Sequence, residues 1–224
     1  LLNEAFMTAA SRLLWIVWAA ALLLLATTIV GCDEDDDNDD DDNPPHSVDF
    51  SEVVAAGTSS AALDVVVDDQ RRAVIGGTIE ENGQDDILLR RYDPEGEIDT
   101  SFANNGIFEE DLAGVYNPAW AGQRDRIDAL AVDSNGRIYF GGYVQSPGAT
   151  DRDLFVGRLD EDGVLDPTWN PANEMSPALP GVFFTDLGGA LSPGSAEYDR
   201  VKQILISEED QAVYLVLEVG IGQS

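Results

Sequence analysis

The stretch ALDVVVDDQRRAVIGG, from Ala62 to Gly77, decides the fold, because a second version of it, IDALAVDSNGRIYFGG, runs from Ile127 to Gly142. Both versions contain a Val-Asp step before a turn and end on a pair of glycines. Apolar residues such as Val65 and Val67 recur at a period of two, which places them on one face of a β-strand. The stretch therefore predicts two antiparallel strands joined by a turn, and it is present twice.

Two further blocks repeat in the same order along the chain, and a third copy begins near the end. Residues 86–102 (DILLRRYDPEGEIDTSF) match 153–169 (DLFVGRLDEDGVLDPTW), 106–114 (GIFEEDLAG) match 181–189 (GVFFTDLGG), and 125–133 (DRIDALAVD) match 199–207 (DRVKQILIS). The repeat period is about 65 to 75 residues, which is typical of repeat architectures such as propellers.

Each copy predicts four short strands with no helical periodicity between them. In the second copy, Asp133–Gly136 supplies hairpin turn residues, because Asn and Gly adopt positive φ at low cost. The strand Ile138–Phe140 follows and is expected to end at the Gly141-Gly142 pair. A third strand is predicted from Leu154 to Leu159, and a fourth in the GVFF segment that starts at Gly181. The predicted fold is all-β, built of propeller-like blades of four antiparallel strands.

The chain resembles the delta-60 repeat family over roughly residues 47–220. The residues that carry the resemblance are D-[IL]-x-[LV]-x-R-x-D-x-[ED]-G-x-[IL]-D-x-[ST]-[FW], then G-[IV]-F, then V-D-x-x-G-R-I-x-x-G-G. The family groups domains of unknown function that are thought to form β-propellers in large exported bacterial proteins. The resemblance therefore implies a propeller fold, and it brings no catalytic residues.

The copies depart from this pattern at two places, and they are few for a propeller. The first copy has Gln70-Arg71-Arg72 in place of the Asn-Gly-Arg turn, and the third has Val216-Leu217 in place of the glycine pair. About two and a half copies lie in residues 47–224, whereas a closed propeller has roughly four to eight blades. We expect an incomplete propeller from a longer protein, with an open array of sheets as the alternative.

The amino-terminal segment is predicted to direct export. Arg12 precedes a charge-free apolar run from Leu13 to Val30, and residues 1–31 therefore form a signal peptide. The end of the run, Ile29-Val30-Gly31-Cys32, resembles the lipobox of bacterial lipoproteins. That resemblance implies that Cys32 is lipidated and that cleavage follows Gly31. The alternative is an uncleaved transmembrane helix, although the run is short for a hydrocarbon core of roughly 30 Å.

Residues 32–46 are predicted to form a lipidated cysteine followed by an acidic, disordered tether. All residues from Asp33 to Asp42 except Asn38 are acidic, and their mutual repulsion favours an extended chain. A loose calcium-binding tract is the alternative for this segment. The expected localisation is the cell envelope, lipid-anchored on the extracytoplasmic side, with inner membrane, outer membrane and cell surface left open.

Charge and composition exclude several function classes. The formal net charge of −31 repels nucleic acid and anionic membrane surfaces. We therefore expect no nucleic-acid partner, and we expect contact with the membrane only through the N-terminal lipid. The chain has one histidine, His46, and one cysteine, Cys32, so Ser-His-Asp and Cys-His triads and His/Cys zinc sites are excluded from the repeats. We therefore expect no enzyme activity and no catalytic residues in this segment.

Within the repeats, the candidate metal ligands are carboxylates in two matching turns. The main expectation is that the protein binds no cofactor. The one possible exception is calcium, because hard cations favour several oxygen ligands near a glycine turn. The alternative is that these aspartates only cap hairpin turns. The candidate calcium ligands are Asp93, Asp99, Asp160, Asp162 and Asp166.

These features predict a lipid-anchored extracytoplasmic protein whose repeat domain is a binding or scaffold module for an extracellular protein or polysaccharide. Four aromatic residues either line a ligand-binding rim or fill the space between blades: Phe102, Trp120, Trp169 and Tyr198. Two other functions remain open. One is an envelope hydrolase whose catalytic residues lie outside this segment, and the other is a structural stalk stiffened by calcium.

Overall fold

The computed structural model describes residues 60–81, 83–148, 151–169, 179–187, 197–209 and 211–221. All of them belong to the unit Ser47–Ser224. The predicted signal peptide, Cys32 and the acidic tether lie outside the described residues. Within the described ranges, no helix is both long enough and apolar enough to cross a membrane.

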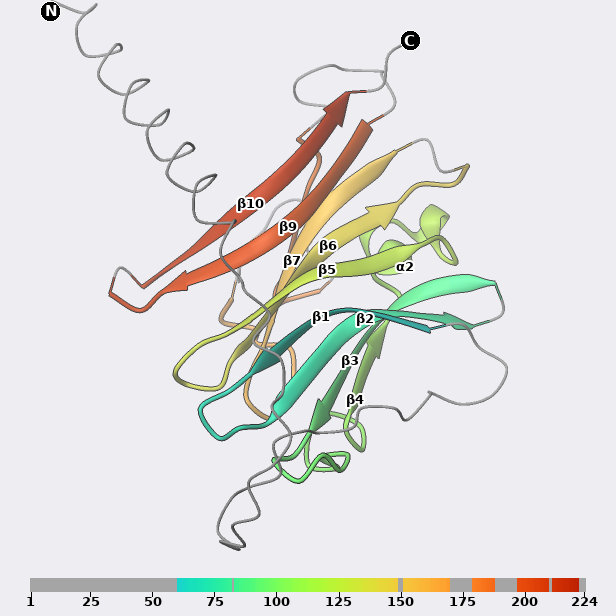
Figure 1. Cartoon of the computed structure of the whole chain (residues 1–224). Coiled ribbons are helices and arrows are strands. Elements are labelled where there is room, and N and C mark those ends of the chain that lie inside the picture. The colour runs from blue at the N-terminus through green and yellow to red at the C-terminus, as the bar shows by residue number, and fades with distance from the viewer. Residues whose placement is uncertain are drawn as a thin grey trace, which may run out of the picture. The chain divides into compact units, whose positions relative to one another are not determined.

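The described residues form three antiparallel sheets, one for each copy of the repeat (Figure 1). The first two sheets have four strands each in sequential order, as the sequence predicts. The first contains β1 (Ser60–Val67), β2 (Ala73–Glu81), β3 (Gln84–Tyr92) and β4 (Ile107–Glu110), and the second contains β5 (Asp125–Val132), β6 (Ile138–Gln145), β7 (Arg152–Leu159) and β8 (Val182–Thr185). The third copy contributes the hairpin of β9 (Glu197–Ser207) and β10 (Ala212–Ile221). The all-β, blade-like prediction is confirmed.

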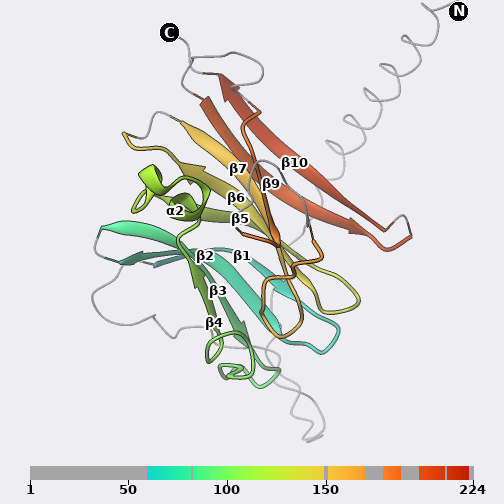
Figure 2. The same cartoon turned by 180° about the vertical axis from the view of Figure 1, so that it is seen from behind.

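The sheets pack face to face, with the second between the first and the third (Figures 1 and 2). The core of the first junction includes Leu89 from the first sheet and Phe140 from the second, both fully buried. The core of the second junction includes Val156 and Val201. The sheets do not close into a ring among the described residues, as expected for incomplete propeller blades.

The exposure of one repeated strand position shows what this packing covers. Leu130 and Ile204, in the first strands of the second and third sheets, are only 5% and 4% exposed because the preceding sheet lies over them. The equivalent residue of the first sheet, Val65, is 54% exposed. Each copy therefore buries the apolar face of its first strand against the copy before it.

The prediction that the glycine pairs end their strands is wrong. Both pairs lie inside strands, Gly76-Gly77 in β2 and Gly141-Gly142 in β6. In each pair, the first glycine lets the next sheet come close, and the second lets the backbone of the neighbouring strand come close. A Cβ on Gly76 would lie 3.0 Å from Leu130 of the next sheet. A Cβ on Gly77 would lie 1.8 Å from the carbonyl oxygen of Ala61, which a β-bulge in β1 pushes toward it.

The same bulge recurs in every copy. It lies between Ile127 and Ala129 in β5, and the third hairpin has a register shift opposite Val216 and Leu217. The third copy thus keeps its bulged hairpin although Val216-Leu217 replace the glycine pair. The bulge is therefore a property of the repeat and does not depend on those glycines.

The first turn of each complete copy is held by one aspartate and one arginine. Asp133 accepts hydrogen bonds from the backbone amides of Asn135 and Arg137, and the Arg137 side chain returns to it at 2.6 Å. Asp68 and Arg72 make the same contacts in the first copy. The unusual Gln70-Arg71-Arg72 turn therefore keeps the repeat geometry.

The connection between the first and second sheets contains a short helix that the sequence pattern does not predict. The helix α2 (Leu112–Tyr116) is followed by the 3-10 turn η1 (Pro118–Trp120). Asp111 caps α2 by accepting a hydrogen bond from Gly114 N at 2.8 Å. This connection carries Asp111 to the junction between the two sheets.

Candidate functional site

The predicted calcium ligands Asp93, Asp160 and Asp162 lie in two equivalent hairpin turns. Asp93 Oδ1 accepts hydrogen bonds from the amides of Glu95 and Glu97 at 3.1 and 2.9 Å. Asp160 Oδ1 accepts matching bonds from the amides of Asp162 and Val164. The capping oxygens are thus engaged in closing the turns, which is the structural alternative that the sequence left open.

The other two predicted ligands, Asp99 and Asp166, form ion pairs with buried arginines. Arg91 Nε lies 2.8 Å from Asp99, and Arg158 Nη2 lies 2.5 Å from Asp166. Burial raises the pKa of Asp166, but hydrogen bonds from Thr168 and the charge of Arg158 outweigh that effect and hold the pKa below its ordinary value. None of the five predicted ligands belongs to the carboxylate group, described below, that has metal-ligand spacing in the described part of the chain.

Arg91 also joins the first sheet to the turn of the second. Its guanidinium donates to the backbone carbonyl of Glu161 and lies 4.6 Å from the centre of the Phe102 ring. Phe102 is fully buried, and a Cβ on Gly163 would lie only 2.6 Å from it. Phe102 is therefore a packing residue of the junction, and it does not lie on a binding rim.

At the second junction, the equivalent arginine and aromatic residue border a cavity of about 140 Å³. Arg158 lies over the Trp169 ring at 4.9 Å, and Tyr139 meets that ring edge-on. Arg158 Nε and Trp169 Nε1 are buried donors without a hydrogen-bond partner. Trp120 is half-buried against Tyr116, and Tyr198 is exposed. The cavity is therefore lined by an arginine beside two aromatic rings, while Arg158 Nε and Trp169 Nε1 lie beneath its surface.

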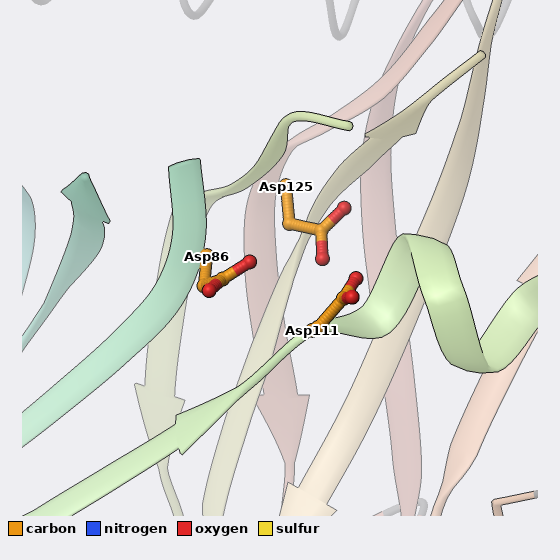
Figure 3. Close-up of side chains that lie close together, drawn as sticks. All are labelled: Asp86, Asp111 and Asp125. Carbon is orange, nitrogen blue, oxygen red and sulfur yellow. The ribbon is translucent and has the colours of Figure 1, made fainter. Parts of the chain in front are cut away.

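A group of three carboxylates that sequence reasoning missed lies at the junction between the first and second sheets. Asp86 comes from β3, Asp111 precedes α2, and Asp125 begins β5. One ligand oxygen from each lies within 4.8 Å of the others. Figure 3 shows the three side chains converging from these separate elements.

Asp125 is the most enclosed member of this carboxylate triad. It is fully buried, and its Oδ2 accepts a hydrogen bond from Ala113 N at 2.8 Å. Its Oδ1 is buried without any hydrogen-bond partner. Burial, together with the nearby Asp111 and Asp86 charges, raises the pKa of Asp125 to about 8, although the backbone amides of Ala113 and Leu112 oppose the shift. Such a carboxylate needs either a proton or a cation beside it.

The repeat places the same three aspartates at the second junction. Asp153, Asp186 and Asp199 align with Asp86, Asp111 and Asp125, respectively. Asp199 is fully buried and accepts a hydrogen bond from Leu187 N at 2.6 Å, as Asp125 does from Ala113. Among the described residues, however, only the first set has metal-ligand spacing. The alignment of three aspartates was the signal in the sequence that could have indicated this site.

Tyr116 distinguishes the second junction from the first. It stacks on Phe184 with ring centres 4.9 Å apart, and its hydroxyl group is hydrogen-bonded to Asp153. Burial and the neighbouring Asp151, Asp186 and Asp199 raise the pKa of Asp153 to about 7, although the Tyr116 hydrogen bond lowers it. The Tyr116 side chain therefore occupies the space beside Asp153.

Comparison with known proteins agrees with the repeated fold. A family model described as a domain of unknown function (DUF5122) with a beta-propeller fold matches residues 72–102 and 134–168. Each match covers the two middle strands of a four-stranded sheet and the turn that follows the third strand, and it ends at or just before the aromatic residue Phe102 or Trp169. No curated protein matches the chain. The two complete copies are therefore similar to repeats of a β-propeller family whose function is unknown.

Proposed function

We propose that this protein is a lipid-anchored, extracytoplasmic binding or scaffold module, with a propeller-like domain of the delta-60 type carried on an acidic tether. The apolar run that ends at Gly31-Cys32 supports the anchor, and the acidic residues that follow support the tether. We propose a non-enzymatic role, because the sequence from Ser47 to Ser224 contains neither the histidine nor the cysteine of a Ser-His-Asp or Cys-His triad. The ligand is an extracellular protein or polysaccharide.

The observation that carries the binding role is the cavity at the second junction. At the first junction, the equivalent Arg91 binds the backbone carbonyl of Glu161, so this surface of a sheet is suited to hold a turn of another segment. Arg158 and Trp169 present the same arginine and aromatic pair at the cavity, together with the Tyr139 ring. A peptide turn or a sugar supplies the oxygen acceptors and apolar faces that suit an arginine beside aromatic rings.

Binding is tested with the full chain on arrays of peptides and polysaccharides. We expect signals that fall at least tenfold in Arg158→Ala and Trp169→Ala, and that persist in Arg124→Ala, whose side chain is 62% exposed and lies outside the cavity. Equal signals for all variants would remove the cavity from the proposal. Cleavage of an arrayed polymer would favour the hydrolase instead.

The anchor is tested by mass spectrometry of the protein purified from the membrane fraction. We expect an amino-terminal peptide that begins at Cys32 and carries the mass of a diacylglyceryl group, with no such peptide from Cys32→Ser. An intact segment 1–31 joined to unmodified Cys32 would contradict lipidation and favour the membrane-spanning alternative.

A further inference from the structure

We propose that Asp86, Asp111 and Asp125 bind one calcium ion at the junction between the first and second sheets. The site lies away from the turns in which the sequence predicts calcium ligands. It depends neither on the lipid anchor nor on the ligand of the cavity, because all three aspartates belong to a different junction from Arg158 and Trp169.

The spacing of the three carboxylates suits calcium. Calcium binds oxygen ligands at about 2.3–2.6 Å, so two ligands on opposite sides of the ion are at most about 5 Å apart. The three ligand oxygens lie within 4.8 Å of one another, which leaves room for one ion among them. The site offers only oxygen donors, which excludes the nitrogen and sulfur ligands that zinc prefers.

The buried Oδ1 of Asp125 is an independent indication of a ligand. Asp125 is fixed by the hydrogen bond from Ala113 N to its Oδ2, so Oδ1 cannot rotate toward another donor without breaking that bond. A buried carboxylate oxygen without a partner costs free energy, and a bound cation removes that cost.

The position of the site indicates what the ion does. Asp86 belongs to the third strand of the first sheet and Asp125 to the first strand of the second, while Asp111 begins the connection between them. An ion held by all three joins two sheets that otherwise meet mainly through apolar side chains. Calcium is therefore expected to stiffen the junction and to fix the angle between the blades.

The test is calorimetric titration of the full chain with calcium chloride, using Asp125→Asn as the test variant and Asp160→Asn as the matched control. We expect one site with a dissociation constant of roughly 10⁻⁷–10⁻⁵ M in the wild type and in Asp160→Asn, and at least a hundredfold weaker binding in Asp125→Asn. The acidic residues from Asp33 to Asp42 are the same in all three proteins, so their weak binding is a common background. Loss of the site in Asp160→Asn alone would overturn the proposal and favour the turn carboxylates.

Thermal unfolding separates loss of the ion from loss of the fold. The side-chain amide that Asp125→Asn introduces can still accept the hydrogen bond from Ala113 N through its oxygen, so in chelator at pH 8 we expect this variant to melt at or above the wild-type temperature. Calcium at a hundredfold excess over its dissociation constant should raise the wild-type midpoint by about 5–10 °C and leave the variant unchanged. Equal stabilisation of both proteins, no stabilisation of the wild type, or equal stabilisation by magnesium would each overturn the calcium assignment.

Discussion

Arg71 is a residue whose backbone conformation is unfavourable for its type. Its φ is 63°, the left-handed region that the equivalent residue of the second copy, Gly136, adopts with a φ of 74°. Residues with a Cβ pay roughly 1–2 kcal/mol for this conformation. The turn nevertheless forms, because Asp68 binds the amide and the side chain of Arg72.

We therefore predict that Arg71→Gly stabilises the protein by about 0.5–1 kcal/mol, because glycine adopts this φ at little cost but loses more entropy on folding. The reverse change at the matching position, Gly136→Ala, should destabilise by about 1 kcal/mol. Urea denaturation gives both values. A less stable Arg71→Gly protein would show that the arginine side chain contributes more than its backbone strain costs.

Asp153 should make stability depend on pH. Its pKa is raised to about 7 in the folded protein, above the ordinary value of 3.8, so the folded state holds a proton that the unfolded state has released between these values. Stability should therefore fall as pH rises from about 4 to about 7, and the loss should be complete above that range. The loss attributable to Asp153 between pH 5 and pH 8 should be roughly 1–3 kcal/mol.

The measurement is the midpoint of thermal unfolding in chelator across this pH range, for the wild type and for Asp153→Asn. The variant keeps a hydrogen-bonding group beside Tyr116 but cannot ionise. We expect it to gain stability over the wild type as pH rises from about 5 to about 8. Parallel pH profiles for the two proteins would show that Asp153 has an ordinary pKa.

Each blade depends on a bulge in its first strand, which brings a backbone carbonyl close to the strand beside it. A Cβ on Gly142 would lie 1.8 Å from the carbonyl oxygen of Arg126, so a side chain there requires the bulge of β5 to shift. We predict that Gly142→Ala costs more than about 3 kcal/mol. Gly220 lies in β10 with its nearest neighbour at 3.4 Å, so Gly220→Ala should change stability by less than about 0.5 kcal/mol.

Urea denaturation of the two alanine variants tests this view of the glycine pair. A mild effect at Gly142, comparable to that at Gly220, would mean that the bulge can move or disappear. Position 217 of the third copy already has a leucine in the equivalent place, so relaxation of the bulge is the specific alternative.

The glycine pair also shows where prediction from the sequence stops. Two adjacent glycines weaken a strand and normally suggest its end, so the pattern predicted a strand that stops at Phe140. The structure continues β6 to Gln145, because Gly141 faces Val201 of the next sheet and Gly142 faces the bulge. Those reasons depend on contacts between strands and between copies, which a local pattern does not contain.

At the scale of the whole molecule, the repeat alone was enough to predict the sheets and their order, because three blocks recur in the same sequence. The carboxylate triad was harder to predict, since Asp86, Asp111 and Asp125 belong to three elements that meet only when two copies pack together. The turn aspartates, such as Asp93 and Asp160, looked more like ligands because they lie near a glycine. In the structure their Oδ1 atoms cap backbone amides.

The central claim of this account is that the fold is stabilised by neighbouring copies, each covering the apolar face of the next. The most direct test compares two residues at the same repeat position, Leu130 and Val65, by urea denaturation of the full chain. Leu130→Ala should cost about 2–5 kcal/mol, because it leaves a cavity where the first sheet covers the second. Val65→Ala should cost less than about 1 kcal/mol, because that side chain is 54% exposed. Equal costs at the two positions would contradict the claim that burial between copies holds the sheets together.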